Sequence, residues 1–91
     1  MEFEWDTPKA AGNRNKHGVS FDEASDVFAD APIIAFDDDH SADEERFIAV
    51  GVSTRNRVLV VSHTYRDGRV RIISARAATK KEQQSYGEDQ T

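Results

Sequence analysis

The chain has no cysteine, only two prolines and a single methionine among its 91 residues. The absence of cysteine excludes disulfides and thiolate metal sites, and it suits a reducing compartment such as the cytoplasm. The longest strongly apolar run, Val58 to Val61, is far too short to cross a bilayer. The N-terminal MEFEWDTPK has no basic stretch followed by an apolar one, so we predict no secretory signal. We therefore expect one soluble cytoplasmic domain over residues 1–91.

What the sequence does contain is charge, and it is unevenly distributed. The formal net charge is −5. Residues 1–45 hold three Lys or Arg and thirteen Asp or Glu, a net charge of −10. Residues 46–91 hold nine Lys or Arg and four Asp or Glu, a net charge of +5. The second half could therefore meet a polyanion, provided that the acids of the first half face elsewhere.

The first third of the chain predicts one short strand and two helices. FEWD, residues 3–6, alternates apolar and acidic residues, as a half-buried strand does. A helix is predicted over residues 7–18, with Thr7 as its N-cap and Gly18 as its terminator, although a glycine and two asparagines weaken it. An amphipathic helix follows over residues 19–30.

Ser20 and Glu23 form a capping box on the second helix, which Pro32 ends. Strands and a last helix fill the rest of the sequence. Asp67-Gly68 is a strong hairpin signal between two strands. Thr79 begins the terminal helix with a second capping box, and the last five residues are expected to fray. The expected strands are residues 33–38, 46–53, 57–66 and 69–77, and the helix is residues 79–86.

This order predicts an α+β fold in which helices pack on one face of a mostly antiparallel sheet. The strand over residues 57–66 is apolar on both faces at its centre, which is typical of a central strand. His63 lies inside that strand, where a hydrogen-bonded core histidine is the more common role.

Arginines gather on the last two strands. Strict alternation puts Arg69 and Arg71 on one face of the last strand and Arg76 on the other. Thr64 and Arg66 lie across the hairpin turn and could join a phosphate-binding cluster, because each guanidinium can hold a phosphate through two parallel hydrogen bonds. The alternative is that these arginines protect a sheet edge or pair with the abundant carboxylates.

Lys16 and His17 lie where the first helix is expected to end. Cations are favoured there by the helix dipole, which is a sufficient structural reason for both residues. A functional alternative is that His17 transfers protons near neutral pH while Lys16 holds a phosphate.

Three other groups of residues are candidates for chemistry. His40 lies in the acidic run DDDHSADEE, but consecutive aspartates diverge, so a solvated loop is favoured over a metal site. Arg46 follows Glu45 at a strand entrance, where a structural ion pair is expected. Tyr86 follows Lys80 and Lys81 on the terminal helix; it either packs in the core or stacks on an RNA base.

Several blocks of the sequence together resemble a known family. FEWD, PKAAGNRNKHGVSFDEASDVF, DHSADEERFIAVG and RIISARAATKKEQQSY are similar, in order and spacing, to the BrnT toxins of type II toxin–antitoxin systems. The resemblance runs from Phe3 to Tyr86. It implies a RelE-like α+β fold and a metal-independent endoribonuclease activity, without cofactor, that arrests growth. It also implies a BrnA-like ribbon-helix-helix antitoxin that joins the toxin in a heterotetramer. In that complex only the antitoxin would contact DNA.

For RNA cleavage without a metal, the chemistry suggests a role for each of several residues. Arg66, Arg71 and Arg76 would stabilise the phosphate, with Lys16 in support, and His17 would act as acid or base. Expected contacts to RNA come from Thr64, Lys80, Lys81 and Tyr86. The interpretation requires the arginines to converge and not to be held individually by carboxylates. The alternatives are a non-catalytic module that holds a DNA-binding partner and a metal-dependent nuclease that uses the DDDH loop.

Overall fold

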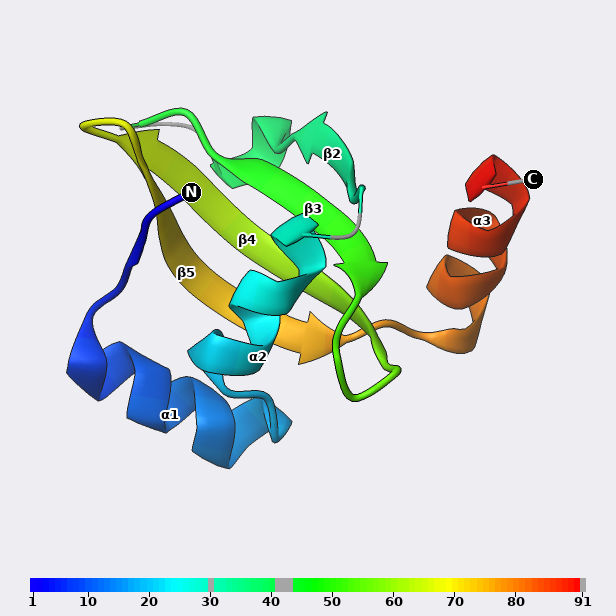
Figure 1. The fold of residues 1–91 in the computed structure, drawn as a ribbon, viewed down its shortest axis with the longest axis horizontal. Helices are drawn as coiled ribbons and strands as arrows, with labels where there is room; N and C mark the ends of the chain where they lie inside the picture. The colour runs from blue at the N-terminus through cyan, green and yellow to red at the C-terminus, as the bar shows by residue number, and fades with distance from the viewer. Residues whose placement is uncertain (30, 41–43, 91) are drawn as a thin grey trace.

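The computed structural model of the chain describes residues 1–29, 31–40 and 44–90. Within these residues it contains a five-stranded sheet, three α-helices and two short 3-10 helices (Figure 1). The predicted α+β class is confirmed. The elements in chain order are β1 (Phe3–Glu4), α1 (Thr7–His17), α2 (Phe21–Ser25), η1 (Asp26–Ala29), β2 (Ile33–Phe36), η2 (Asp38–His40), β3 (Phe47–Val52), β4 (Val58–Arg66), β5 (Arg69–Ala77) and α3 (Lys80–Gln90).

The strands lie side by side in the order β1-β5-β4-β3-β2. β1 runs parallel to β5, and the other neighbours are antiparallel. β4 is central, and its consecutive residues Leu59, Val60 and Val61 are all buried, which confirms the prediction of a strand that is apolar on both faces. Asp67 and Gly68 both have positive φ, 54° and 76°, as the two-residue turn between β4 and β5 requires.

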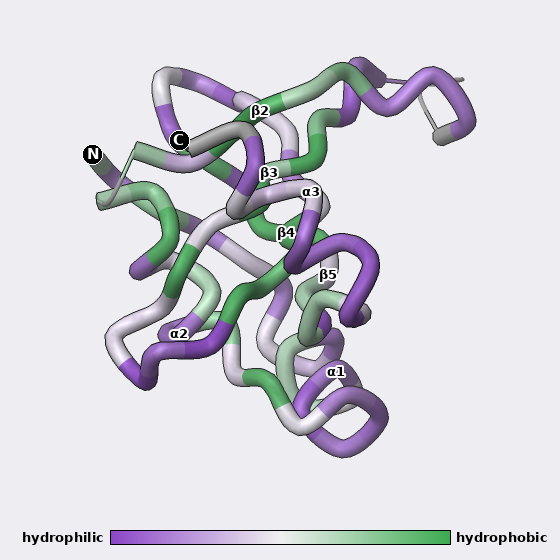
Figure 2. Tube along the Cα trace, turned by 90° about the vertical axis from the view of Figure 1, so that its right-hand side faces the viewer, coloured by the Kyte–Doolittle hydropathy of each residue, from purple (hydrophilic) through white to green (hydrophobic). Residues whose placement is uncertain are grey.

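Helices α1 and α2 lie on one face of the sheet and enclose the hydrophobic core with it (Figure 1). Phe21, Ala24 and Val27 supply the helical side of this core, whereas Leu59, Val61, Val70, Ile72 and Ala75 supply the sheet side. Figure 2 shows hydrophobic segments along the strands, while α1 is hydrophilic over much of its length. Helix α1 therefore needs another means of attachment.

Asn13 provides that attachment. It is buried, and its Nδ2 donates to the Ala75 carbonyl at 2.8 Å and to the Val19 carbonyl at 3.0 Å. Its Oδ1 accepts from the Ala75 amide at 3.1 Å. The side-chain amide thus pairs with β5 as a neighbouring strand would, in a region that the two-residue β1 does not reach. The asparagine expected to weaken the helix is what holds it to the sheet.

The helix ends follow the predicted local chemistry with two corrections. The N-cap of α1 is Asp6, not Thr7, because the Asp6 carboxylate accepts from the Lys9 amide at 3.0 Å. Gly18 ends α1 with a φ of 70°, as predicted. The capping box at Ser20 is only half formed, because the Glu23 carboxylate bonds elsewhere.

Helix α3 differs from the prediction in place and length. It does not join α1 and α2, because its residues line a pocket with Ile33 and Val50, and these strand residues point to the other face of the sheet. Its predicted capping box is confirmed: Thr79 Oγ1 accepts from the Glu82 amide at 3.2 Å, and Glu82 Oε1 accepts from the Thr79 amide at 2.9 Å. The helix continues to Gln90 through part of the tail that was expected to fray.

Candidate functional site

The arginines of β4 and β5 share the sheet face opposite α1 and α2, which we call the outer face. Cross-strand neighbours are Arg66 with Arg69, Thr64 with Arg71, and Val60 with Arg76. Strict alternation had placed Arg71 and Arg76 on opposite faces, and that prediction was wrong.

A β-bulge accounts for the error. Ser62 pairs with Ser74, whereas His63 pairs with Ile72, so Ile73 is an extra residue on β5. One extra residue reverses the alternation of side chains beyond it. The bulge therefore turns Arg76 to the same face as Arg71, and no periodicity in the sequence signals it.

Two hollows lie on this face. The first, which we call the His17 hollow, has a volume of about 320 Å³, and its polar lining comes from His17, Asp37, Asp39, Arg46, Ser62, Ser74 and Arg76. The second, which we call the Arg71 hollow, has a volume of about 170 Å³, and its charged lining comes from Asp6, Lys9, Glu44, Arg46, Arg66 and Arg71. Arg46 and Ile73 line both hollows, so the two adjoin.

Each predicted phosphate-binding arginine is paired with a carboxylate. Arg66 donates to Glu44 at 3.0 Å, and Arg71 donates to Glu4 at 2.7 Å. Both acids come from residues 1–45. We had expected the acids of this half to face away from the arginines, but these two reach them. The arginines converge on one face, but in the free chain each is held individually. These pairs agree with the alternative that the arginines are carboxylate partners, and the condition that no carboxylate holds them individually is not met in the free chain.

Arg76 makes the most complete of these pairs. Its two terminal nitrogens donate to the two oxygens of Glu82 at 2.7 and 2.9 Å. This guanidinium, together with the Thr79 amide, lowers the pKa of Glu82 to about 2. The arginine and glutamate side chains are 43% and 36% exposed, so solvent screens the pair and its net stabilisation is small. Little net free energy therefore holds the carboxylate on Arg76.

Arg46 was expected to be a structural residue, and its position gives it a wider role. It precedes β3 and lies where the two hollows meet, between Arg71 and Arg76. Its carbonyl accepts from the Asp37 amide at 2.8 Å, which holds the two ends of the acidic segment together. Only the pairing of β3 with β4 brings Arg46 to this face. Lys9 of α1 lines the Arg71 hollow and was likewise not predicted.

His17 and Lys16 end α1 and are both exposed, but only His17 lines the hollow with Arg76. Its position depends on Asn13, one turn earlier, which fixes α1 against β5 at Ala75. Lys16 lies outside both hollows.

Thr64 lies on the outer face, but its hydroxyl is already used. The side chain is buried, with 3% exposed, and its Oγ1 donates to the Glu45 carbonyl at 2.6 Å. This bond positions the segment that carries Arg46. The geometry thus favours a supporting role over the direct RNA contact predicted for this residue.

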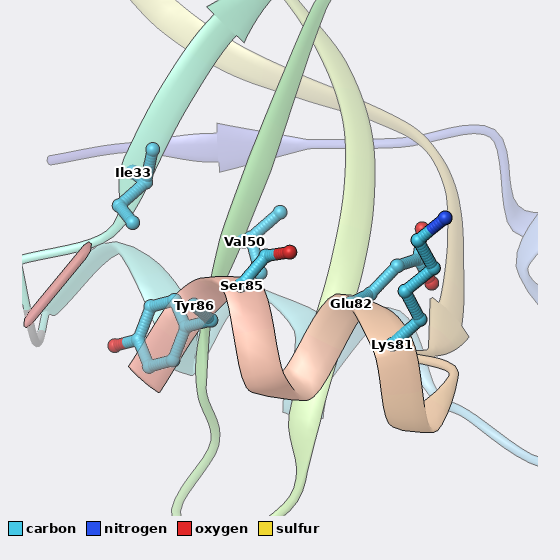
Figure 3. A pocket seen from close by; sticks show the side chains of 6 residues that line it. All are labelled: Ile33, Val50, Lys81, Glu82, Ser85 and Tyr86. Carbon is cyan, nitrogen blue, oxygen red and sulfur yellow. The ribbon is translucent and has the colours of Figure 1, made fainter. Parts of the chain in front are cut away.

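The predicted RNA-binding residues of α3 lie at the other end of the outer face. Lys81 and Tyr86 line a pocket of about 260 Å³ with Glu82, Ile33 and Val50 (Figure 3). Tyr86 is half-buried along this pocket, and Lys80 is exposed outside it. Because Glu82 lines this pocket and also holds Arg76, the pocket and the His17 hollow are linked through one ion pair.

Other titratable groups serve the fold. His63 is fully buried; its Nδ1 lies 3.2 Å from the Val61 carbonyl and its Nε2 lies 3.3 Å from the Tyr65 hydroxyl, and burial lowers its pKa. It faces the core, as predicted. Among the described residues, no group of three His, Cys, Asp or Glu side chains could hold a metal ion. The side chain of His40 lies outside what the structure describes.

Comparisons with known proteins place this fold and its outer face in context. The family described as "Ribonuclease toxin, BrnT, of type II toxin-antitoxin system" matches residues 5–82. The crystal structure of the Brucella abortus ribonuclease toxin BrnT, at 1.1 Å resolution, is similar with a TM-score of 0.67 and 24% identity, covering 88% of this chain and 99% of that one. No curated protein matches the sequence.

These comparisons agree with the resemblance found in the sequence. No described helix has the length and apolar character needed to span a bilayer. The match extends over the outer face, from Trp5 before α1 to Glu82 of α3. The chain belongs to the BrnT family of ribonuclease toxins of type II toxin–antitoxin systems.

Proposed function

We propose that the chain is a metal-independent endoribonuclease whose cleavage of RNA in the cytoplasm inhibits translation and arrests growth. We further propose that a cognate ribbon-helix-helix antitoxin neutralises it in a heterotetramer, in which only the antitoxin contacts DNA. The observation that carries the proposal is the meeting of His17, Arg46 and Arg76 in one hollow, with Arg66 and Arg71 in the hollow beside it.

The chemistry needs no group beyond those of the chain and the RNA. The 2′ oxygen of a ribose attacks the adjacent phosphorus, so the 2′-O–P bond forms and the P–O5′ bond breaks, leaving a 2′,3′-cyclic phosphate. A base takes the 2′ proton, and the leaving 5′ oxygen receives a proton. His17 is exposed and can carry one of these protons, while guanidinium groups stabilise the added negative charge of the phosphorane.

RNA binding then exchanges ion-pair partners. A phosphate replaces Glu82 on Arg76, Glu4 on Arg71 and Glu44 on Arg66, since a phosphate offers a guanidinium the same two-bond geometry as a carboxylate. The displaced carboxylates regain water because all three are at least a quarter exposed. Lys16 lies at the end of α1 and outside both hollows, so its support goes to an adjoining phosphate of the same RNA. Adjoining nucleotides lie along α3, where Lys80 and Lys81 attract the backbone and the ring of Tyr86 stacks on a base.

The direct test is cleavage of a single-stranded RNA by the purified chain in excess EDTA. His17→Ala should lower the rate by about a hundredfold or more, as expected for loss of a general acid or base. Arg76→Ala should also lower it, whereas Arg55→Ala, a matched change at an exposed turn outside both hollows, should leave it unchanged. Loss of cleavage in EDTA would assign the reaction to a metal instead. Growth arrest with intact RNA would contradict the enzymatic part.

A second function is favoured by one observation, the carboxylate on each of Arg66, Arg71 and Arg76. A chain whose cations serve only internal pairs would be a binding module that holds a DNA-binding partner and cuts nothing. In that case Arg71→Ala and His17→Ala would leave both toxicity and partner binding unchanged. Toxicity of these variants therefore separates the two functions.

A further inference from the structure

β2 forms one edge of the sheet, and no strand among the described residues covers its outward side. It pairs with β3 through Ile33 to Phe36, and no other described strand pairs with it. Alternate backbone N–H and C=O groups of such a strand point away from the sheet, which makes the edge a template for another strand. Proteins often protect an edge with lysine, but β2 is IIAF and carries none.

An apolar surface accompanies this open edge. Ile34 and Phe36 are 44% and 49% exposed, and both point to the helix-covered face, since their partners on β3 are Ala49 and Phe47. The rings of Phe36 and Phe47 lie 5.6 Å apart, and Phe47 lies 5.3 Å from Tyr65, which is 51% exposed. Helices α1 and α2 leave this end of the face uncovered. We call Ile34, Phe36 and Tyr65 the edge patch.

The chain segment that contains β2 carries charge of one sign, although Lys81 of α3 lines a pocket with Ile33 on the outer face. Residues 19–45, which contain β2, hold ten Asp or Glu and no Lys or Arg. Asp38 and Asp39, which follow β2 closely, are exposed. A partner suited to this surface is therefore basic as well as apolar. A second copy of the chain does not fit, because pairing two β2 strands would bring two acidic segments together.

We infer that the open edge of β2 and the edge patch bind an extended segment of the antitoxin in which basic and apolar residues alternate. That segment adds a strand to the sheet, its backbone pairs with β2, its apolar side chains cover Ile34 and Phe36, and its cations meet the flanking acids. The inference rests on the proposed function for the existence of this partner and specifies where and how the partner binds.

This docking surface is separate from the cleavage residues. Ile34 and Phe36 line neither the His17 hollow nor the Arg71 hollow. Asp37 and Asp39, just after β2, do line the His17 hollow, so a segment bound along the edge ends beside it. A partner held at the edge is thereby placed to block RNA from the hollow.

The test uses the chain co-purified with the protein encoded by the neighbouring reading frame. Amide hydrogen exchange should slow at residues 33–36 in the complex relative to the free chain. The double variant Ile34→Lys/Phe36→Lys should weaken the complex at least a hundredfold, whereas Ala11→Lys, which adds a lysine at an exposed position of α1, should not. Without the partner, the double variant should cleave RNA at the wild-type rate, and this rate would also show that the variant folds.

Several outcomes would overturn the inference. If the amides of residues 33–36 exchange hydrogen as fast in the wild-type complex as in the free chain, the inference is wrong. This result does not depend on whether the double variant folds. Wild-type affinity of a folded double variant would also contradict it, as would a dimer of the free chain that Ile34→Lys dissolves. Failure of the proposed function is a different result: the wild-type chain would then leave RNA intact whether or not the partner protects β2.

Discussion

Arg76 shows how one side chain can serve both the fold and the proposed reaction. Its carboxylate partner, Glu82, also caps α3 through the Thr79 amide. The pair therefore couples the start of α3 to the His17 hollow. In the free chain the guanidinium of Arg76, which lines the hollow with His17, is occupied, so under the proposed function the charge available to RNA depends on how readily Glu82 leaves.

Glu82→Gln tests this dependence. Glutamine keeps an oxygen for the Thr79 amide but loses the negative charge that competes with phosphate. Because an exposed pair contributes at most about 1 kcal/mol, RNA cleavage should rise by up to about fivefold. Initial rates on a short RNA at sub-saturating concentration measure the effect. Glu2→Gln is the control, since its partner Arg69 lines neither hollow, and equal rates for wild type and Glu82→Gln would contradict the coupling.

Glu23 is the most buried carboxylate in an ion pair among the described residues. It accepts from Arg57 Nε at 2.9 Å and from the Ser53 hydroxyl at 2.7 Å, and these bonds, that with Arg57 foremost, lower its pKa. The pair ties α2 to the turn between β3 and β4. Its contribution is structural, on the side of the sheet away from the hollows.

We expect Glu23→Gln to lower the free energy of unfolding by about 2 kcal/mol at pH 7, because Arg57 loses its charged partner. The folded-state pKa of Glu23 lies below its ordinary value of 4.5, so its stabilisation is fully present above that pH and is lost as the pH falls below it. Urea unfolding at pH 7 and at pH 3 should therefore show a difference between wild type and variant that shrinks in acid. A difference that stayed constant would argue against this pair.

Helix α1 depends on few contacts, and this matters because it carries His17. It buries little apolar surface, with Ala10 packed against the core and Asn13 bonded to β5. The amide of Asn13 occupies both backbone groups of Ala75 at a stretch of the β5 edge that no described strand covers. The position of the candidate acid or base thus rests on one polar side chain.

Asn13→Ala should lower the free energy of unfolding by about 3 kcal/mol, since it leaves the buried N–H and C=O of Ala75 without partners. RNA cleavage should fall as well, because the helix that places His17 in the hollow with Arg76 is no longer anchored. Asn15→Ala on the same helix is exposed and should change stability by less than about 0.5 kcal/mol. Urea unfolding and cleavage rates measure both effects. Equal stability of the two variants would show that Asn13 does not anchor the helix.

The molecule as a whole is acidic, yet the arginines of β4 and β5 gather on one face of the sheet. Glu4 and Glu44 neutralise that face in the free chain. The open edge of β2 lies within the most acidic stretch of the sequence. The chain thus presents two chemically different surfaces, to which our proposals assign an RNA phosphate and a basic partner.

This arrangement predicts a modest salt dependence of RNA binding. If Arg66, Arg71 and Arg76 each meet one phosphate, the logarithm of affinity for single-stranded RNA should fall against the logarithm of salt concentration with a slope of about −2. The His17→Ala variant allows binding without cleavage, and fluorescence anisotropy between about 50 and 200 mM salt measures the slope. A slope near zero would mean that the arginines keep their carboxylates in the complex.

Local patterns in the sequence anticipated much of the fold. Gly18, the turn at Asp67-Gly68 and the capping box of Thr79 and Glu82 were all predicted, because each depends on residues within one turn of chain. The central position of β4 followed from apolar residues on both of its faces. The BrnT family was also recognisable, since its blocks lie in order along the chain.

Long-range pairing determined the remainder, and with it the site. Glu4, the carboxylate partner of Arg71, lies 67 residues away in the chain, so no local sequence pattern predicts the pair. The same separation applies to Arg69 and Glu2, and Asn13 meets Ala75 across 62 residues. Local chemistry specifies turns and caps because their partners are fixed by chain geometry. The bulge at Ile73 arises only when whole strands pair in register, and it decides that Arg76 lines the same hollow as His17.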